Sequence, residues 1–397
     1  MDKHQTRDVF TPAKPARVAF VERESVNNRL VDSLNTPGKQ IVVYGHSGTG
    51  KTTLLVNKLT QVYEHNITTR CMKGLTFEQL LLDAFDQLAP YFASEKSENI
   101  KTSSGIDLGA SYLLLQAKVA AQTTSEAGEK HARMLPPQLT PQALGRFLGA
   151  KKACWVLEDF HKIDEEEKYK LSQLMKVFMD LAYEYAELKI IAIGAVDTAR
   201  QVVDYDREMR NRVAEVHVSL MTEQEVTAII DKGEKALNIE ISGDIKKLVG
   251  RHSNGLASVC HHLCLNMCNA AGVFCTVEGE SLKLTKEHFA TAVKAYVDEA
   301  SDSIKSAFDK AFKQRRKTQY ENARLILDAL CSLPENGTAR FDILRQIRHE
   351  QPKYPEANLK YLLPKLCTAE YGAIVRFDSN SGLHSFSEPI YRAYALA

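Results

Sequence analysis

Apolar and polar residues alternate along the first 220 residues in a way that predicts strands separated by helices. Short apolar and β-branched runs predict five strands, at residues 40–44, 67–72, 153–157, 189–193 and 213–218. Helical spacing lies between them, and Thr76 to Gln79 fits a capping box that opens one of these helices. Strand–helix alternation predicts an α/β fold, with a parallel sheet of about five strands and helices on both faces.

After residue 220 the pattern becomes helical. Thr222 to Glu225 forms a second capping box, and Ser242 and Thr285 are placed to cap two later helices, so a helical subdomain is expected. Towards the end, three helical patterns precede two β patterns, at 322–333, 340–350, 356–367, 373–377 and 383–386. Three helices and a hairpin predict a winged helix.

These patterns divide the chain into three expected domains. A core at 1–220 is followed by a helical lid at 221–300 and a winged-helix-like domain at 301–397. Residues 1–17, with two prolines and many charges, are expected to be a loose arm. Residues 94–137 are polar and too many for a structureless loop in a compact domain, so an insertion is expected there.

Composition limits the functions that the chain can have. Lys and Arg number 51 against 50 Asp and Glu, so no overall field draws the chain toward nucleic acid or a membrane. No apolar run reaches the ~18–20 residues that span a bilayer, and no secretory signal is seen, so a cytoplasmic protein is expected. Cys260, Cys264 and Cys268 share one face of a predicted helix, and packing of that face is favoured over a metal site.

The segment after the first strand matches the phosphate-binding motif G-x-x-x-x-G-K-[ST] in full. Its residues, with the threonine that follows, are Gly45, His46, Ser47, Gly48, Thr49, Gly50, Lys51, Thr52 and Thr53. Glycines let backbone N–H groups turn inward around an anion, and the helix N-terminus adds partial positive charge. We expect this P-loop to bind ATP, with Lys51 on the β- and γ-phosphates and the Thr52 hydroxyl on Mg²⁺.

A pair of acids, Glu158 and Asp159, follows the strand at 153–157. This is where the acids that assist ATP hydrolysis belong, so Glu158 is expected to hold Mg²⁺ and Asp159 to polarise the attacking water. The usual order is Asp before Glu, so the division of roles stays open, and a solvated strand end is the alternative. The gap between the two motifs contains the strand at 67–72. An intervening strand marks the additional-strand class of P-loop ATPases, which includes the AAA+ and STAND proteins.

With these motifs, most of the chain resembles AAA+ ATPases of the ORC/Cdc6-like and STAND-like branch. Phe20 to Glu24 resembles the family's F-V-G-R-E segment, with Glu22 in place of glycine. Residues 158–161 resemble its acid-acid-aromatic-His motif, and 386–394 resemble the ending of bacterial and archaeal STAND-like ATPases. The resemblance implies a P-loop AAA+ core, a helical lid and nucleotide-dependent assembly.

The resemblance also implies a residue that acts between subunits. Residues 207–213 resemble the family's E-L-R-x-R segment, which makes Arg210 and Arg212 candidates for a catalytic arginine finger. A guanidinium beside the γ-phosphate neutralises charge that develops during transfer. A solvated arginine or a salt bridge is the alternative.

Two other family positions lack their usual residues. The strand at 189–193 takes the sensor 1 position, where Asp197 or Thr198 is the possible substitute for the missing polar tip. The lid lacks the sensor 2 arginine, and His261 or His262 would have to contact the phosphates instead. For both histidines, a place in the core or on the helix surface is favoured.

Three functions follow from these features. The first is a slow ATPase that works as a homo-oligomeric switch and signals to a separate partner protein, in bacterial antiviral defence or a mobile element. The alternative is a DNA-binding AAA+ ATPase of the initiator or transposition-regulator type, acting through the winged helix and the basic residues at 310–317. A binding scaffold that does not hydrolyse ATP is the third.

Overall fold

The computed structural model describes residues 3–93, 139–195, 209, 211–300, 302–313, 319–335, 337–378 and 381–397. The chain forms two compact units. The sheet unit comprises Glu22–Ser47 and Leu54–Val218, and the helical unit comprises Met1–Val21, Gly48–Thr53 and Ser219–Ala397. The insertion expected at 94–137 lies outside the described residues, and the three expected domain boundaries stay a prediction.

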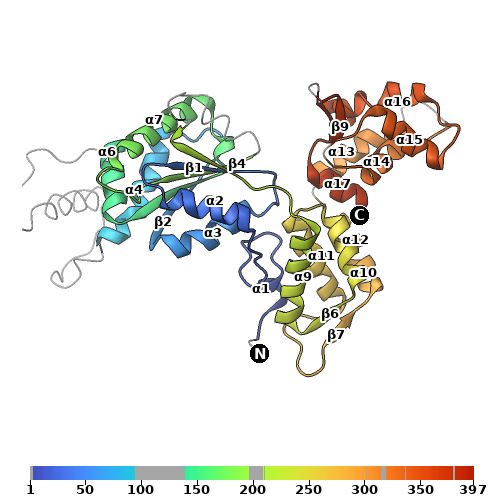
Figure 1. Cartoon of the computed structure of the whole chain (residues 1–397), viewed down its shortest axis with the longest axis horizontal. Coiled ribbons are helices and arrows are strands. Elements are labelled where there is room, and N and C mark those ends of the chain that lie inside the picture. The colour runs from blue at the N-terminus through green and yellow to red at the C-terminus, as the bar shows by residue number, and fades with distance from the viewer. Residues whose placement is uncertain are drawn as a thin grey trace, which may run out of the picture. The chain divides into compact units, whose positions relative to one another are not determined.

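The sheet unit is built on five parallel strands, as the sequence predicts (Figure 1). They are β1 (Gln40–Tyr44), β2 (His65–Arg70), β3 (Ala153–Glu158), β4 (Ile190–Gly194) and β5 (Val213–His217). Their order across the sheet is β2-β3-β4-β1-β5. Because all pairings are parallel, the carboxyl ends of β1, β3 and β4 meet at one edge of the sheet.

The strand that separates the two motif strands in the sheet is not the one that lies between them in the sequence. β4 pairs with β1 on one side and with β3 on the other, whereas β2 pairs only with β3 and lies at the edge. The intervening strand is therefore β4, for which the resemblance predicts the sensor 1 position. Sequence order alone does not carry this information, since parallel strands connected by helices need not be neighbours.

Helices cover both faces of this sheet, because both faces of its strands are apolar. Ile41 and Val43 join one hydrophobic cluster with α2 (Glu24–Asn35) and α3 (Lys51–Val62). Val42 points to the other cluster. The helices on that side are α4 (Phe77–Ala93), α6 (Pro141–Ala150) and α7 (Glu165–Leu181). The short η2 (Phe160–Lys162) follows β3.

The lid region of the helical unit consists of four helices and a small sheet. The helices are α9 (Glu223–Leu237), α10 (Gly243–Ser253), α11 (Ala257–Ala270) and α12 (Lys286–Glu299). The capping box at Thr222 is present in full, as predicted. The sequence analysis missed the parallel pair formed by β6 (Ile239–Ile241) and β7 (Leu282–Leu284), whose three-residue strands are too short to show a period.

The N-terminal arm is ordered on the lid, so the prediction of a loose arm was wrong. It contains a one-turn helix, α1 (Thr6–Val9), and Gln5 forms a β-bridge with Cys275. The Thr6 hydroxyl donates to the carbonyl of Val273 at 2.9 Å. Phe10 is fully buried among lid residues. The anchors are the buried side chains of Val9 and Phe10, the Thr6 hydroxyl and backbone bonds, which composition does not reveal.

The C-terminal part contains the elements expected there and several more. They are α13 (Asp302–Phe312), α14 (Asn322–Ser332), α15 (Arg340–Glu350), α16 (Glu356–Leu362), η4 (Lys365–Cys367), η5 (Ala369–Tyr371), β8 (Val375–Asp378), β9 (Leu383–Phe386) and α17 (Pro389–Leu396). β8 and β9 are antiparallel, and Thr338 forms a further antiparallel bridge to His384 of β9. A winged helix stays a prediction for this segment.

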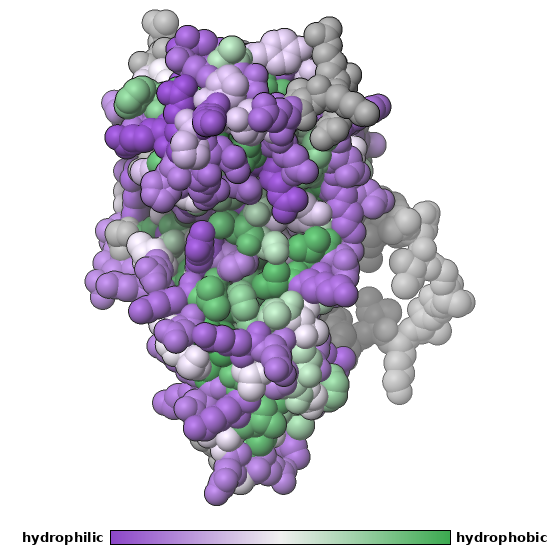
Figure 2. Space-filling view, turned by 90° about the vertical axis from the view of Figure 1, so that its right-hand side faces the viewer, coloured by the Kyte–Doolittle hydropathy of each residue, from purple (hydrophilic) through white to green (hydrophobic). Residues whose placement is uncertain are grey.

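The helices in the described part of the chain include none that could cross a membrane, since none is both long and apolar enough. On the face seen in Figure 2, hydrophilic side chains predominate and apolar ones gather mainly near the middle.

Candidate functional site

The P-loop follows β1 and leads into α3, the context that the motif requires. β1 is held at its base by Gln40, whose N–H donates to the carbonyl of Arg212 at 3.0 Å. The Gln40 side-chain oxygen accepts from the N–H of Ile190 at 2.6 Å. One residue thereby fixes β1 against both of its neighbours, and the loop at the other end of β1 starts from a rigid strand.

The loop has a backbone that favours glycine at three positions. Gly45, Gly48 and Gly50 have φ angles of 154°, 80° and 90°. A residue with a side chain would be strained at Gly48 and Gly50. Residues with positive φ that alternate with ordinary ones turn successive backbone N–H groups toward one point. Lys51 is the first residue of α3, so the helix N-terminus lies directly after the loop. This is a ready-made anion site.

Glu158 is the last residue of β3, at the same edge of the sheet as the end of β1. Its carboxylate lies 3.6 Å from Nε of Arg70, the last residue of β2, and its side chain is 21% exposed. The register pairs these two residues directly. Sequence analysis missed Arg70, since only the β2–β3 register brings it to the acid.

Asp159 adopts a left-handed conformation, with φ at 56°. Its Oδ2 lies 2.6 Å from Nζ of Lys162, and both side chains are half-exposed. The two acids have different partners, since Glu158 lies beside Arg70 and Asp159 pairs with Lys162. Their division of roles stays a prediction.

Glu22, which stands where the family has glycine, forms an ion pair with Lys58 of α3 at 2.7 Å. The Lys58 side chain is only 7% exposed. The resembling segment is thus attached to the helix that begins at the P-loop. A direct contact of Glu22 with nucleotide stays untested.

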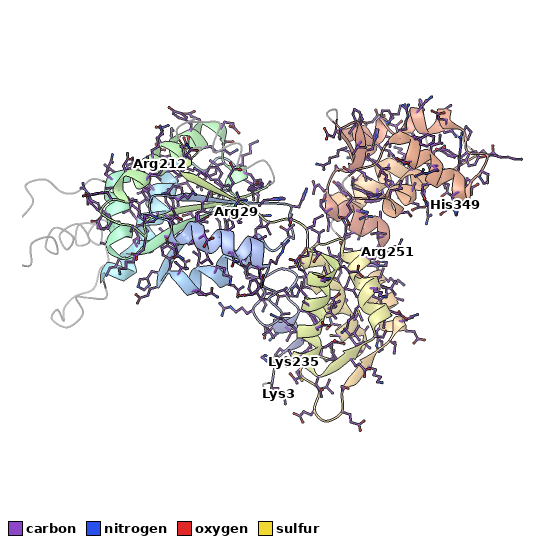
Figure 3. The ribbon with its side chains drawn as sticks, in the orientation of Figure 1. Lys3, Arg29, Arg212, Lys235, Arg251 and His349 are labelled. Carbon is purple, nitrogen blue, oxygen red and sulfur yellow. The ribbon has the colours of Figure 1, made fainter. Side chains whose placement is uncertain are left out.

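Of the two arginine-finger candidates, the structure describes only Arg212. Arg210 lies outside the described residues. Arg212, labelled in Figure 3, pairs with Asp180 of α7 at 3.4 Å, and both side chains are exposed. An exposed pair of this kind is weak, about 0–1 kcal/mol, so it holds Arg212 only loosely. Asp197 and Thr198, the sensor 1 candidates, are also outside the described residues.

Both lid histidines have structural partners. His261 is buried in α11, and its Nδ1 accepts the N–H of Thr11 from the N-terminal arm at 3.2 Å. Burial lowers the pKa of His261 to about 4. Nε2 of His262 lies 2.7 Å from a carboxylate oxygen of Glu299. The core and surface positions favoured by the sequence are therefore observed.

The three cysteines of α11 are packed inside the lid, as predicted. Cys260, Cys264 and Cys268 are all fully buried. Burial raises the pKa of Cys268 to about 12, which keeps its thiol neutral. Within the residues that the structure describes, no three His, Cys, Asp or Glu side chains gather as a metal site.

A cavity of about 720 Å³ opens in the sheet unit between α2 and the start of β5. Arg29 and Asp32 of α2 and Glu215 of β5 are among its lining residues. It lies toward the amino end of β5, whereas the P-loop follows the carboxyl end of β1. The cavity is therefore distinct from the phosphate site.

No protein-family model matches the sequence, and the search of curated proteins gave no match. Among solved structures, the Walker-type ATPase PABY2304 of Pyrococcus abyssi is 15% identical with a TM-score of 0.52, covering 97% of this chain and 98% of that one. Cdc6p of Pyrobaculum aerophilum is 16% identical with a TM-score of 0.46, covering 98% of this chain and 96% of that one. At sequence identities this low, the likeness shows a shared fold and nothing more. The strand order, the P-loop and the likeness to the first structure agree, and the chain has the fold of a Walker-type P-loop ATPase.

Proposed function

We propose that this protein binds and hydrolyses ATP and acts as a nucleotide-driven oligomeric switch for a partner protein. The observation that carries the proposal is the glycine geometry of the P-loop at the end of β1, with Glu158 at the same edge of the sheet. Catalysis of phosphoryl transfer is mostly positioning and charge stabilisation, and these groups supply both.

The residues fit nucleotide with magnesium. Backbone N–H groups of the loop and Lys51 supply positive charge for the phosphates. The Thr52 hydroxyl and the Glu158 carboxylate are hard oxygen donors, which Mg²⁺ prefers. Magnesium, when bound, would neutralise charge on the phosphates. Asp159, just beyond Glu158, is a second carboxylate for orienting water.

Binding of Mg²⁺–ATP by Lys51→Ala tests the phosphate site. Loss of one charge-assisted contact, worth about 1.5–3 kcal/mol, should weaken binding by at least tenfold. Lys73→Ala removes an exposed lysine from the sheet unit and should bind like the original protein. Equal affinity in the two variants would contradict the assignment of the loop.

Assembly is tested by mass in solution with ATP and magnesium. We expect the mass to rise with ATP, to stay high in Glu158→Gln or Asp159→Asn because hydrolysis slows, and to fall in Arg210→Ala or Arg212→Ala. An unchanged mass in every case would show that the isolated protein does not form an ATP site shared between subunits.

A separate partner is proposed because the sequence shows no second catalytic motif through which the switch could act. Bacterial defence and mobile elements are the settings in which the resembling branch works. Expression in bacteria challenged with phage tests the first setting. Protection that is lost in Lys51→Ala supports it, and the absence of protection argues against it.

DNA binding is the second candidate, favoured by the bridge from Thr338 to β9, which adds a third antiparallel segment beside β8 and β9. The donors of α16 and the residues after it have other partners, however. Asn358 donates to Asn322 at 3.0 Å, Lys360 pairs with Glu356 at 2.7 Å, and Lys365 lies over the Tyr361 ring. Few donors remain for base edges.

Binding of a duplex probe at several salt concentrations separates the two candidates. Lys310 and Lys313 belong to the basic run, while Arg315, Arg316 and Lys317 lie outside the described residues. Arg315→Ala with Arg316→Ala should reduce the salt slope by about two if these arginines contact phosphates. Lys283→Ala with Lys286→Ala, which removes two charges from the lid, is the control.

A further inference from the structure

The first turn of α11 is bonded to the P-loop. The N–H of Ser258 donates to the carbonyl of Gly48 at 3.1 Å, and both residues belong to the helical unit. A Cβ on Gly48 would lie 2.3 Å from Oγ of Ser258 and 3.6 Å from Leu256. The lid helix thus approaches the loop so closely that only glycine fits. A change in the loop backbone at Gly48 must act on the start of α11.

Gly255 holds the same turn on its other side. It has a φ of 70°, and its carbonyl accepts the N–H of Met221 at 2.8 Å. A Cβ there would lie 2.8 Å from both the Leu220 side chain and the Met221 carbonyl. The turn from Asn254 to Ser258 is therefore a short, tightly packed connection between α10 and α11.

Asn254 attaches this turn to the end of the chain. It ends α10 in a left-handed conformation, three residues after Arg251, which is labelled in Figure 3. Its amide nitrogen donates to the carbonyl of Pro389 at 3.0 Å. Its amide oxygen accepts from Nη1 of Arg392 at 2.8 Å. Both partners belong to α17, so the amide is satisfied at both ends by one helix.

Arg392 connects α17 with a second C-terminal helix. Its Nη2 donates to the carbonyls of Cys331 at 2.9 Å and Leu333 at 3.1 Å, at the end of α14. It also pairs with Glu335, and its side chain is only 14% exposed. A largely buried guanidinium with four acceptors is costly to leave half-paired, so α14, α17 and Asn254 are expected to move together.

We propose that the Asn254–Ser258 turn couples the nucleotide state of the P-loop to the C-terminal helices, with Arg392 as the coupling residue. The hydrogen bond from Ser258 to Gly48 would transmit a change in the P-loop to the turn. The hydrogen bonds between Asn254 and α17 would transmit it from the turn to the C-terminal helices. The proposal rests on the proposed binding of ATP. Packed connections of this kind have discrete arrangements, so a small shift at one end becomes a change of partner at the other.

Hydrogen–deuterium exchange with and without Mg²⁺–ATP tests the coupling. We expect ATP to change exchange of the P-loop, of the first turn of α11, and of α14 and α17. Asn254→Gly keeps the left-handed conformation and removes only the amide. Asn238→Gly is the matched control, because Asn238 also ends a lid helix in a left-handed conformation, with φ at 53°. Its amide donates to Val277 and Gly279, inside the lid.

In Asn254→Gly the response of α14 and α17 should shrink by about fivefold or more while that of the P-loop persists, and Asn238→Gly should behave like the original protein. Arg392→Gln should match Asn254→Gly, and the double variant should add little. A C-terminal response that persists in Asn254→Gly, or is absent from the original protein while its P-loop responds, overturns the coupling. A P-loop that ignores ATP in the original protein overturns the proposed function itself.

Discussion

Nε of Arg70 lies 3.6 Å from the carboxylate of Glu158, across the pairing of β2 with β3. The Arg70 side chain is 88% exposed, so solvent screens the pair and limits it to a fraction of 1 kcal/mol. In the proposed site, where Glu158 holds Mg²⁺, the guanidinium would compete weakly with the ion for this carboxylate. Arg70 therefore adds little to the stability of the fold, and its expected effect is on the acid.

Replacing Arg70 by Gln should leave stability nearly unchanged and raise ATP turnover at limiting magnesium by up to about fivefold. Steady-state rates across a magnesium titration measure this. Arg146→Gln, in α6, is a control that changes charge in the same unit. A large drop in turnover would show that Arg70 assists catalysis instead.

Gly233 of α9 should resist replacement by alanine, against its helix propensity. A Cβ there would lie 2.1 Å from the Phe10 ring, so the arm must shift. We expect Gly233→Ala to lower the free energy of unfolding by about 1–3 kcal/mol and to expose residues 3–10 to protease.

Gly250→Ala in α10 provides the contrast. Its Cβ would meet only Glu223, at 3.8 Å, so the alanine should stabilise the helix by about 0.5–1 kcal/mol. Denaturant unfolding of both variants measures the difference. If Gly233→Ala also stabilised the protein, the packing of Phe10 would not require a glycine at position 233.

His261 should make the helical unit sensitive to acid. Its pKa is about 4 in the folded protein, below its ordinary value of 6.5, because burial disfavours the charged form of the ring. Between these two values the unfolded chain binds more protons than the folded one. Its stabilising effect is therefore complete above pH 6.5 and is lost as the pH falls toward 4, by about 3 kcal/mol at most.

His261→Gln should flatten this part of the stability profile. Hydrogen exchange in α11 at pH 7 and pH 4.5 measures the stability of the original protein and of the variant at both values. An identical loss in the original protein and the variant would assign the acid sensitivity to other groups.

Lys189 should make the sheet unit more stable in alkali, so its pH dependence has the same sign as that of His261. It is fully buried, donates to the carbonyls of Thr36 and Lys39, and burial lowers its pKa from 10.5 to about 8. Above pH 8 the folded protein releases this proton while the unfolded chain keeps it. Stability should therefore rise between pH 8 and 10.5, by about 1–3 kcal/mol.

In Lys189→Met this rise should disappear. Fluorescence of Trp155, the single tryptophan, reports unfolding of the sheet unit because its indole is buried in β3 and donates to Thr69 at 3.0 Å. The difference between the two proteins at pH 7.5 and pH 10 isolates Lys189 from other groups. Equal slopes would show that the lysine keeps its ordinary pKa.

Features that depend on neighbours in the sequence were predictable. The P-loop strand, the capping box at Thr222 and the three helices before the hairpin follow from local spacing, and the structure has them. The arm was misjudged because Thr6 finds its partner 267 positions away. Gln40, Arg70 and Lys189 were missed for the same reason: each acts on backbone or side chains that only the sheet brings near.

During synthesis, the N-terminal arm is made well before the lid residues that it contacts in the folded protein. Residues 3–10 leave the ribosome before their anchors in α9, in α11 and at Val273, which follows Thr6 by 267 positions. At about 5–20 residues per second this interval is on the order of 10–50 s. During that time Phe10 has no lid to enter. The arm can therefore close on the lid only after the strands of the sheet unit have been synthesised.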